Sequence, residues 1–141
     1  MGYLKNELSE KSRYHLSKHR YLELKHHCLQ YPEWKQRLNE ITDISIHEMS
    51  LPVTKVSKWP SNETERIALE KYVLRSKINQ VENVARKADE SLWLYILKGV
   101  TEDGVTYTYL RNMMGIPCGK NMYYDRYRRF FWLLAQDLQA L

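Results

Sequence analysis

A basic and aromatic stretch near the C-terminus has the side chains needed to bind a polyanion. Residues 115–131 read GIPCGKNMYYDRYRRFF and contain four lysine or arginine residues but only one acid, Asp125. Lysine and arginine neutralise phosphates, and both can also donate to base edges, as can asparagine. A solvated helix face above an aromatic core would have the same composition. The neighbouring segments must therefore decide between the two interpretations.

A short helix, a turn and a long helix surround this stretch. Residues 106–115 (TYTYLRNMMG) predict the short helix, with Thr106 as its N-cap and Gly115 at its end. Pro117 and Gly119 restrict and bend the connection, and a helix of about 20 residues is expected to begin near Gly119. This order is that of a helix-turn-helix, whose second helix enters a DNA groove.

The long helix is expected to have one apolar side and one polar side. Helical spacing predicts a buried stripe formed by Tyr123, Tyr127, Phe130, Leu134 and Leu138. We expect Leu110 to anchor the short helix, and Met113 and Met114 to hold the two helices together. The side chains expected in the major groove are Lys120, Asn121, Tyr124 and Arg128. Those expected to neutralise phosphates are Arg126, Arg129 and Arg111.

Histidines gather between residues 15 and 28, where a metal site is conceivable. His15 and His19 are four residues apart, a helical spacing at which two side chains can share an ion, and the pair His26-His27 precedes Cys28. Structural zinc requires four ligands at recognisable spacing, and no second ligand pair follows. The sequence also lacks a glycine-rich phosphate loop and a nucleophile elbow. We therefore expect no metal, no cofactor and no enzymatic activity.

The remaining pattern is helical, apart from one segment. Residues 3–30 predict a helix, and a second one is expected from the Tyr31-Pro32 pair to about Ile41. The pattern dissolves after Thr42, which predicts a linker or irregular loop. The expected division of the chain is charged N-terminal helices at 1–42, the linker at 43–62, and a long helix with the DNA-binding module at 63–141.

The long helix expected at residues 63–88 has the clearest pattern. Ser61 or Asn62 can cap it, and apolar residues follow at heptad spacing. This seam consists of Ile67, Leu74, Ile78, Val81, Ala85 and Ala88. It could pack on the chain's own core or pair protomers into a homo-oligomer, and the spacing allows both. After it, SLWLYILKG predicts a short apolar helix capped by Ser91 and stopped by Gly99.

Composition agrees with an all-α protein that has a helical N-terminal segment, a long central amphipathic helix and a C-terminal three-helix module. Five glycines and four prolines provide few turns for an all-β fold, and 43% hydrophobic residues argue against global disorder. The net charge of +5 weakly favours a phosphate-bearing partner. Distant cysteines and the lack of a long apolar run predict a cytoplasmic protein with no membrane partner.

Several blocks together resemble a known family. ELKHHCLQYPEWKQRLNEI (23–41) and WPSNETERIALEKYVL (59–74) resemble two landmarks of the RinA-type phage transcriptional regulators. SLWLYILKG (91–99) followed by TYTYLRNMMGIPCGKNMYYDRYRRFFWLLAQDL (106–138) resembles their closing module, which is similar to the DNA-binding region 4 of sigma factors. The segment VTEDGV and the turn Pro117-Cys118-Gly119 depart from that pattern.

The resemblance implies a phage or prophage regulator in a bacterial host. Such a protein would bind double-stranded DNA near a promoter, activate late genes and touch host RNA polymerase. Two alternatives stay open from the residues alone. One is a DNA-packaging component such as a small terminase subunit, which also joins a helix-turn-helix to an oligomerising part. The other is an interaction protein whose aromatic helix is core and whose seam at 63–88 binds a protein partner.

Overall fold

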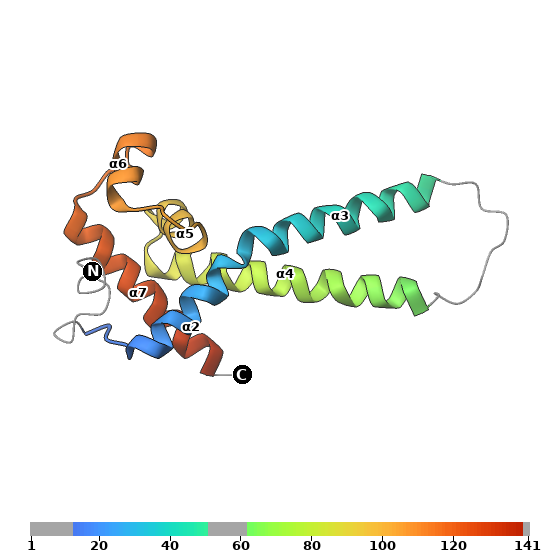
Figure 1. Cartoon of the computed structure of the whole chain (residues 1–141), viewed down its shortest axis with the longest axis horizontal. Coiled ribbons are helices and arrows are strands. Elements are labelled where there is room, and N and C mark those ends of the chain that lie inside the picture. The colour runs from blue at the N-terminus through green and yellow to red at the C-terminus, as the bar shows by residue number, and fades with distance from the viewer. Residues whose placement is uncertain (1–12, 51–61, 140–141) are drawn as a thin grey trace. The chain divides into compact units, whose positions relative to one another are not determined.

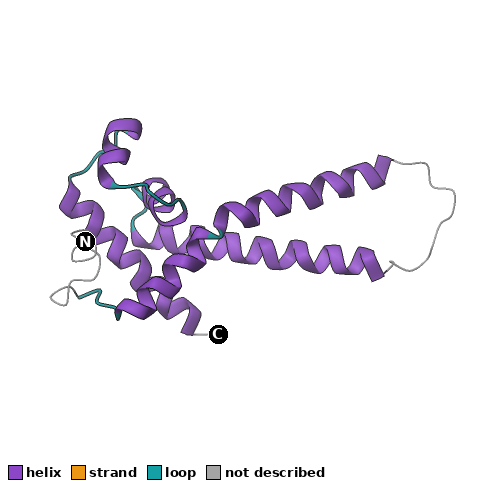
Figure 2. Cartoon of the chain, viewed as in Figure 1, coloured by secondary structure: helices purple, strands orange, loops and turns teal. Residues whose placement is uncertain are grey.

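The described part of the protein is entirely helical. A computed structural model describes residues 13–50 and 62–139, with the backbone alone for residues 44–50. These residues form helices and no strand (Figure 2), which confirms the predicted all-α class. The helices are α2 (Lys18–Leu29), α3 (Tyr31–Ser50), α4 (Asn62–Ala88), α5 (Trp93–Thr101), α6 (Tyr107–Met114) and α7 (Lys120–Gln139).

The chain divides into two compact units that do not follow the expected sequential order. The first unit combines the chain up to Gln30 with the chain from Gln80 onward, and the second is Tyr31–Asn79. Helix α4 contributes to both units. The division differs from the expected 1–42, 43–62 and 63–141 because α2 packs on α5 and α7, which are far away in the sequence. The spacing of residues within one segment does not predict which distant helices will pack together.

The core of the first unit lies where α2, α5 and α7 meet (Figure 1). Tyr21 of α2 packs edge-on against Phe131 of α7, with ring centroids 5.1 Å apart. Its hydroxyl lies 3.0 Å from the hydroxyl of Tyr127, so two buried polar groups satisfy each other. The surrounding buried side chains are Leu24, Cys28, Ile96, Leu110, Phe130 and Leu134.

The second unit is a helical hairpin. Helix α3 and the N-terminal part of α4 run side by side in opposite directions (Figure 1). Arg37 of α3 and Glu70 of α4 form a two-pronged ion pair, with Nε to Oε1 at 2.7 Å and Nη2 to Oε2 at 3.3 Å. The Lys77 ammonium lies 5.6 Å from the centre of the Trp34 ring. Polar contacts at this hairpin thus add to the burial of apolar side chains.

Two helix boundaries near the N-terminus differ from expectation. Helix α2 begins only at Lys18, because the Ser17 hydroxyl caps it by accepting from the Arg20 N–H at 3.3 Å. Residues 3–12 of the expected helix lie outside the described residues. The second expected helix does not end near Ile41 but continues to Ser50. The linker prediction is therefore wrong for 43–50, and residues 51–61 lie outside the described part.

Residues 43–50 stay helical because nothing in them stops a helix. They contain neither proline nor glycine. Thr42, just before them, donates its hydroxyl to the Leu38 carbonyl at 2.8 Å, a bond that forms within a continuing helix. The irregular apolar spacing had suggested a loop, but periodicity alone does not end a helix.

The long central helix agrees closely with its prediction. Helix α4 spans Asn62–Ala88, so Asn62 is its first residue, and the alternative cap Ser61 lies outside the described residues. Ile67 is half-buried, and the rest of the heptad seam, from Leu74 to Ala88, is buried. These side chains pack inside the chain. Their burial agrees with the alternative in which the seam packs on the chain's own core.

Helix α5 differs from expectation at both ends. The helix starts at Trp93, and Ser91 does not cap it. Instead the Asp89 carboxylate accepts from the N–H groups of Ser91 and Leu92, at 2.9 and 3.0 Å. Gly99 does not stop the helix, which continues to Thr101. A Cβ at Gly99 would overlap the Tyr123 hydroxyl, so glycine is needed there for packing.

Replacing Gly99 by alanine tests this close approach. The Tyr123 ring is buried, so the added methyl should force repacking and lower the free energy of unfolding by about 1–3 kcal/mol. Alanine's higher helix propensity offsets part of that loss. Gly119→Ala is the matched control, because a Cβ there meets nothing within 4 Å. Urea unfolding of both variants measures the difference, and equal stabilities would contradict the packing role of Gly99.

Candidate nucleic-acid interface

The turn between α6 and α7 is a sharply defined corner. Thr106 caps α6 by accepting from the Tyr109 N–H at 3.2 Å, as predicted. Gly115 ends α6 in the left-handed region, with φ 63° and ψ 43°, also as predicted. The next N–H, from Ile116, donates to the Leu110 carbonyl at 3.2 Å. The chain therefore leaves α6 in one fixed direction.

The residues that hold the inside of the corner differ in part from those expected. Leu110 is fully buried, as predicted, and Ile116 is only 6% exposed. The Tyr107 hydroxyl donates to the Cys118 carbonyl at 2.7 Å and closes the turn. Met113 and Met114 were expected to hold the helices together, but they are exposed. The left-handed exit at Gly115 brings Ile116 back against the core, where it fills the place expected for the methionines.

Helix α7 buries a wider face than the apolar stripe predicted. Tyr123, Tyr127, Phe130 and Leu134 are buried as expected, and Leu138 is half-buried. Tyr124 is also buried, which contradicts the prediction that it faces a groove. Its ring packs edge-on against Tyr123 and Tyr127, with centroids 5.0 and 6.0 Å away. Tyr124 therefore belongs to an aromatic cluster and cannot reach a base edge.

Arg126, expected at a phosphate, is held by two carboxylates instead. Its Nε donates to Asp89 Oδ2 at 2.9 Å, and its Nη1 donates to Asp125 Oδ2 at 2.7 Å. Partial burial would raise the pKa of Asp89, but hydrogen bonds from Ser91, Arg126 and Leu92 outweigh it and hold that pKa below its usual value. Arg126 therefore joins α7 to the start of α5.

The other expected contact residues fall into two groups. Arg111, Lys120 and Asn121 are exposed. Arg128 and Arg129 are half-buried, and the Nε atom of Arg128 is buried. Of the seven residues that the sequence suggested, the three exposed ones thus flank the corner, and Arg128 and Arg129 present only part of their side chains.

Exposed neighbours that the sequence did not predict as DNA contacts complete this region. We call six of the exposed residues on either side of the turn the corner surface: Arg111, Asn112, Met113, Lys120, Asn121 and Met122. It contains two cations, two amides and two apolar side chains, and no acid. Amides and cations can bind phosphates and base edges, and methionine can contact the thymine methyl group. Met113 and Met122 differ from core methionines only in their exposure. The spacing of methionines in the sequence could therefore not have identified these two as surface residues.

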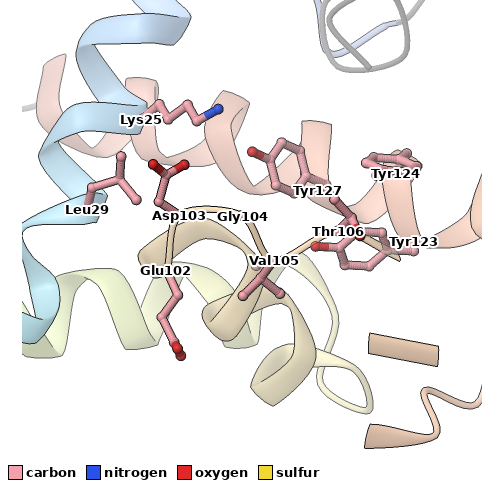
Figure 3. Close-up of a pocket in the computed structure, with 11 residues that line it drawn as sticks. Lys25, Leu29, Glu102, Asp103, Gly104, Val105, Thr106, Tyr123, Tyr124 and Tyr127 are labelled. Carbon is pink, nitrogen blue, oxygen red and sulfur yellow. The ribbon is translucent and has the colours of Figure 1, made fainter. Parts of the chain in front are cut away.

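A cavity of about 230 Å³ lies beside the α5–α6 connection. The connection, residues 102–106, covers one side, and the tyrosines of α7 cover another (Figure 3). Lys25 and Leu29 of α2 also line it, and Figure 3 places Lys25 and Asp103 on the same side. The lining offers charged groups and hydroxyls but no histidine or cysteine. The segment VTEDGV, which departs from the family pattern, contributes much of this lining.

The histidine-rich region does not assemble a metal site in the described residues. No three His, Cys, Asp or Glu side chains come together there. His15 and His19 are exposed, whereas Cys28 is buried, and this burial raises the pKa of its thiol. Over the same part of the chain, no helix is both long and apolar enough to span a bilayer.

Comparison with protein-family models, with curated proteins and with solved structures gave no match. The functional interpretation therefore depends on the geometry of the corner and on the residues that surround it.

The stability of an Arg126→Ala variant tests whether Arg126 has a structural role. Loss of its bonds to Asp89 and Asp125 should lower the free energy of unfolding by about 1–3 kcal/mol. The exposed Arg111 is the control, and Arg111→Ala should change stability by less than about 0.5 kcal/mol. Chemical denaturation measures both. An Arg126→Ala protein of unchanged stability would contradict the structural role.

The lowered pKa of Asp89 makes part of the stability pH-dependent. A carboxyl whose folded pKa is depressed stabilises the fold above its unfolded pKa, near 4, and loses that contribution as the pH falls through the folded value. The wild type should therefore be more stable than Asp89→Asn at neutral pH. The difference should shrink as the pH falls below about 4, toward and through the lowered folded value. Thermal unfolding across this range tests it, and a constant difference would show that Asp89 acts without its charge.

Proposed function

We propose that this protein is a transcriptional regulator that binds double-stranded DNA through α6, the turn at residues 115–119 and α7. The observation that carries the proposal is the corner itself. Its inside is closed by Leu110, by Ile116 and by the hydrogen bond that the Tyr107 hydroxyl donates to the Cys118 carbonyl. Outside, Lys120 and Asn121 are exposed at the start of α7, the part of a recognition helix that contacts bases.

The residues of the corner surface have different roles in this proposal. The first backbone N–H groups of α7 have no partner within the helix, and together with the positive end of the helix dipole they favour a phosphate. Lys120 and Arg111 add charge for the DNA backbone from the two sides of the turn. Asn121 has the donor and acceptor needed for a bidentate contact with adenine, so it is the candidate for reading sequence.

The aromatic and ionic contacts behind α7 support this role indirectly. Tyr124 packs with Tyr123 and Tyr127, and Arg126 is tied to Asp89, so these side chains hold the helix in place. A rigid recognition helix loses little entropy on binding. Arg128 and Arg129 remain candidates for partial contact with the DNA backbone through their exposed portions.

The resemblance to RinA-type phage regulators gives the proposal its biological setting. In that setting the protein acts in a bacterial host, binds near a promoter of phage late genes and activates them, with host RNA polymerase as a further partner. The order of the blocks at 23–41, 59–74, 91–99 and 106–138 supports this setting. The exposed methionines of the corner surface add apolar area that could face DNA or polymerase.

A selection from random DNA duplexes with the purified full chain tests the proposal. We expect one preferred sequence, whose binding weakens as salt rises. Lys120→Ala should weaken binding to all duplexes alike and reduce the slope of log K against log salt by about one. Asn121→Ala should cost about 1–3 kcal/mol on the preferred site and relax the preference at one position.

Two variants serve as controls for these measurements. Lys18→Ala removes the same charge as Lys120→Ala from an exposed position on α2, and it should leave affinity almost unchanged. Tyr124→Phe removes one hydroxyl and keeps the buried ring in place, so it should not affect the sequence preference. Absence of measurable affinity for any duplex at low salt would end the proposal.

A further inference from the structure

An apolar patch on α4 is exposed in the helical hairpin. Leu69, Tyr72 and Val73 are 64%, 70% and 40% exposed. They lie on a face different from that of Glu70 and Leu74, which face α3 and the core. Single exposed apolar residues are common, but three within five positions form a contiguous patch. We call these three residues the α4 patch.

The patch begins a longer uncharged stripe at heptad spacing. Along α4 the exposed residues Leu69, Tyr72, Ser76, Asn79 and Asn83 are separated by alternating steps of three and four. This is the spacing at which one helix packs along another. The stripe is separate from the heptad seam, whose residues from Leu74 to Ala88 are buried in the chain's own core. A second face of α4 is therefore available for a helical partner.

Two opposite charges flank the patch and have no ion-pair partner in the described part of the chain. Glu65 precedes Leu69 by one helical turn, and Arg75 follows Tyr72 by about one turn. Both are exposed. The neighbouring Arg66, by contrast, forms ion pairs with Glu63 and Glu70. The α4 patch thus has an acid at one end and a base at the other.

We propose that the α4 patch binds the same patch of a second copy of this chain, with the two α4 helices antiparallel. A surface with an apolar centre, an acid on one side and a base on the other is complementary to itself under a two-fold rotation. When Leu69 packs against Tyr72 of the other copy, Glu65 comes level with Ser76 of that copy. There it is adjacent to Arg75, and symmetry repeats the ion pair.

The size of the patch sets the expected affinity. From Leu69 to Asn83 the stripe extends over about 21 Å of helix. Its apolar part is only three side chains, and the remainder is polar, so the interface is smaller than that of obligate dimers. We expect a reversible dimer with a Kd on the order of 10–100 µM. This inference does not depend on the proposed DNA binding, because the patch lies in the other unit of the chain.

Sedimentation of the full chain, without DNA, tests the pairing. Between about 5 and about 500 µM the mass should rise from monomer to dimer. Leu69→Lys combined with Tyr72→Lys should keep the protein monomeric over the whole range, with unchanged helix content by circular dichroism. Leu94→Lys is the matched control, because Leu94 is 57% exposed on α5, and the dimer should persist.

A charge exchange tests the antiparallel arrangement. Glu65→Arg alone and Arg75→Glu alone each place like charges together twice in the dimer, and each should weaken it by about 5- to 10-fold. The double variant Glu65→Arg/Arg75→Glu should return to within about two-fold of the wild type. The two positions are about 15 Å apart along one helix, so rescue must come from another copy.

Four results would overturn this inference. They are a wild type that stays monomeric throughout, a dimer that survives the Leu69→Lys/Tyr72→Lys change, a larger ring in place of a dimer, and a double charge variant no better than the single ones. Failure of DNA binding alone would leave the mass measurements unaffected, so the two proposals fail separately.

Discussion

One carboxylate holds the first unit in the arrangement that forms the corner. Asp89 directly follows α4, receives the N–H groups that begin α5, and binds the Arg126 guanidinium of α7. Three helices therefore converge on a group that is only partly accessible to water, where charge-assisted hydrogen bonds are stronger than at the surface. Because α7 is fixed to the start of α5 in this way, the short helix α6 between them has little freedom. The direction of the turn at Gly115 then determines which end of α7 is exposed.

Much of the local structure could be predicted because its causes are local. The all-α class followed from composition, α4 from the heptad spacing of its seam, and both ends of α6 from Thr106 and Gly115. In each case, one or two residues satisfy or direct backbone groups within a single turn. The same holds for the start of α7 near Gly119.

What could not be predicted depends on contacts between distant segments. The helical spacing places Tyr124 on the polar side of α7, but neighbouring rings and packed helices cover it. Arg126 reads as a phosphate ligand, yet its partner Asp89 lies 37 positions earlier in the chain. Gly99 suggests a helix stop, whereas the reason for it is a tyrosine hydroxyl from α7. For the candidate site, Lys120, Asn121 and Arg111 kept their expected exposure, because no packed partner competes for them.

The hydroxyl pair formed by Tyr21 and Tyr127 joins residues 106 positions apart. A ribosome makes the first of these tyrosines early and the second near the end of the chain, so α2 cannot complete its packing until α7 has emerged. The segment 31–79, by contrast, clusters as a compact unit of its own, and all of it has been synthesised well before that. Synthesis thus presents the hairpin first and assembles the corner last. A chain interrupted before α7 would have its hairpin complete and its first unit still unassembled.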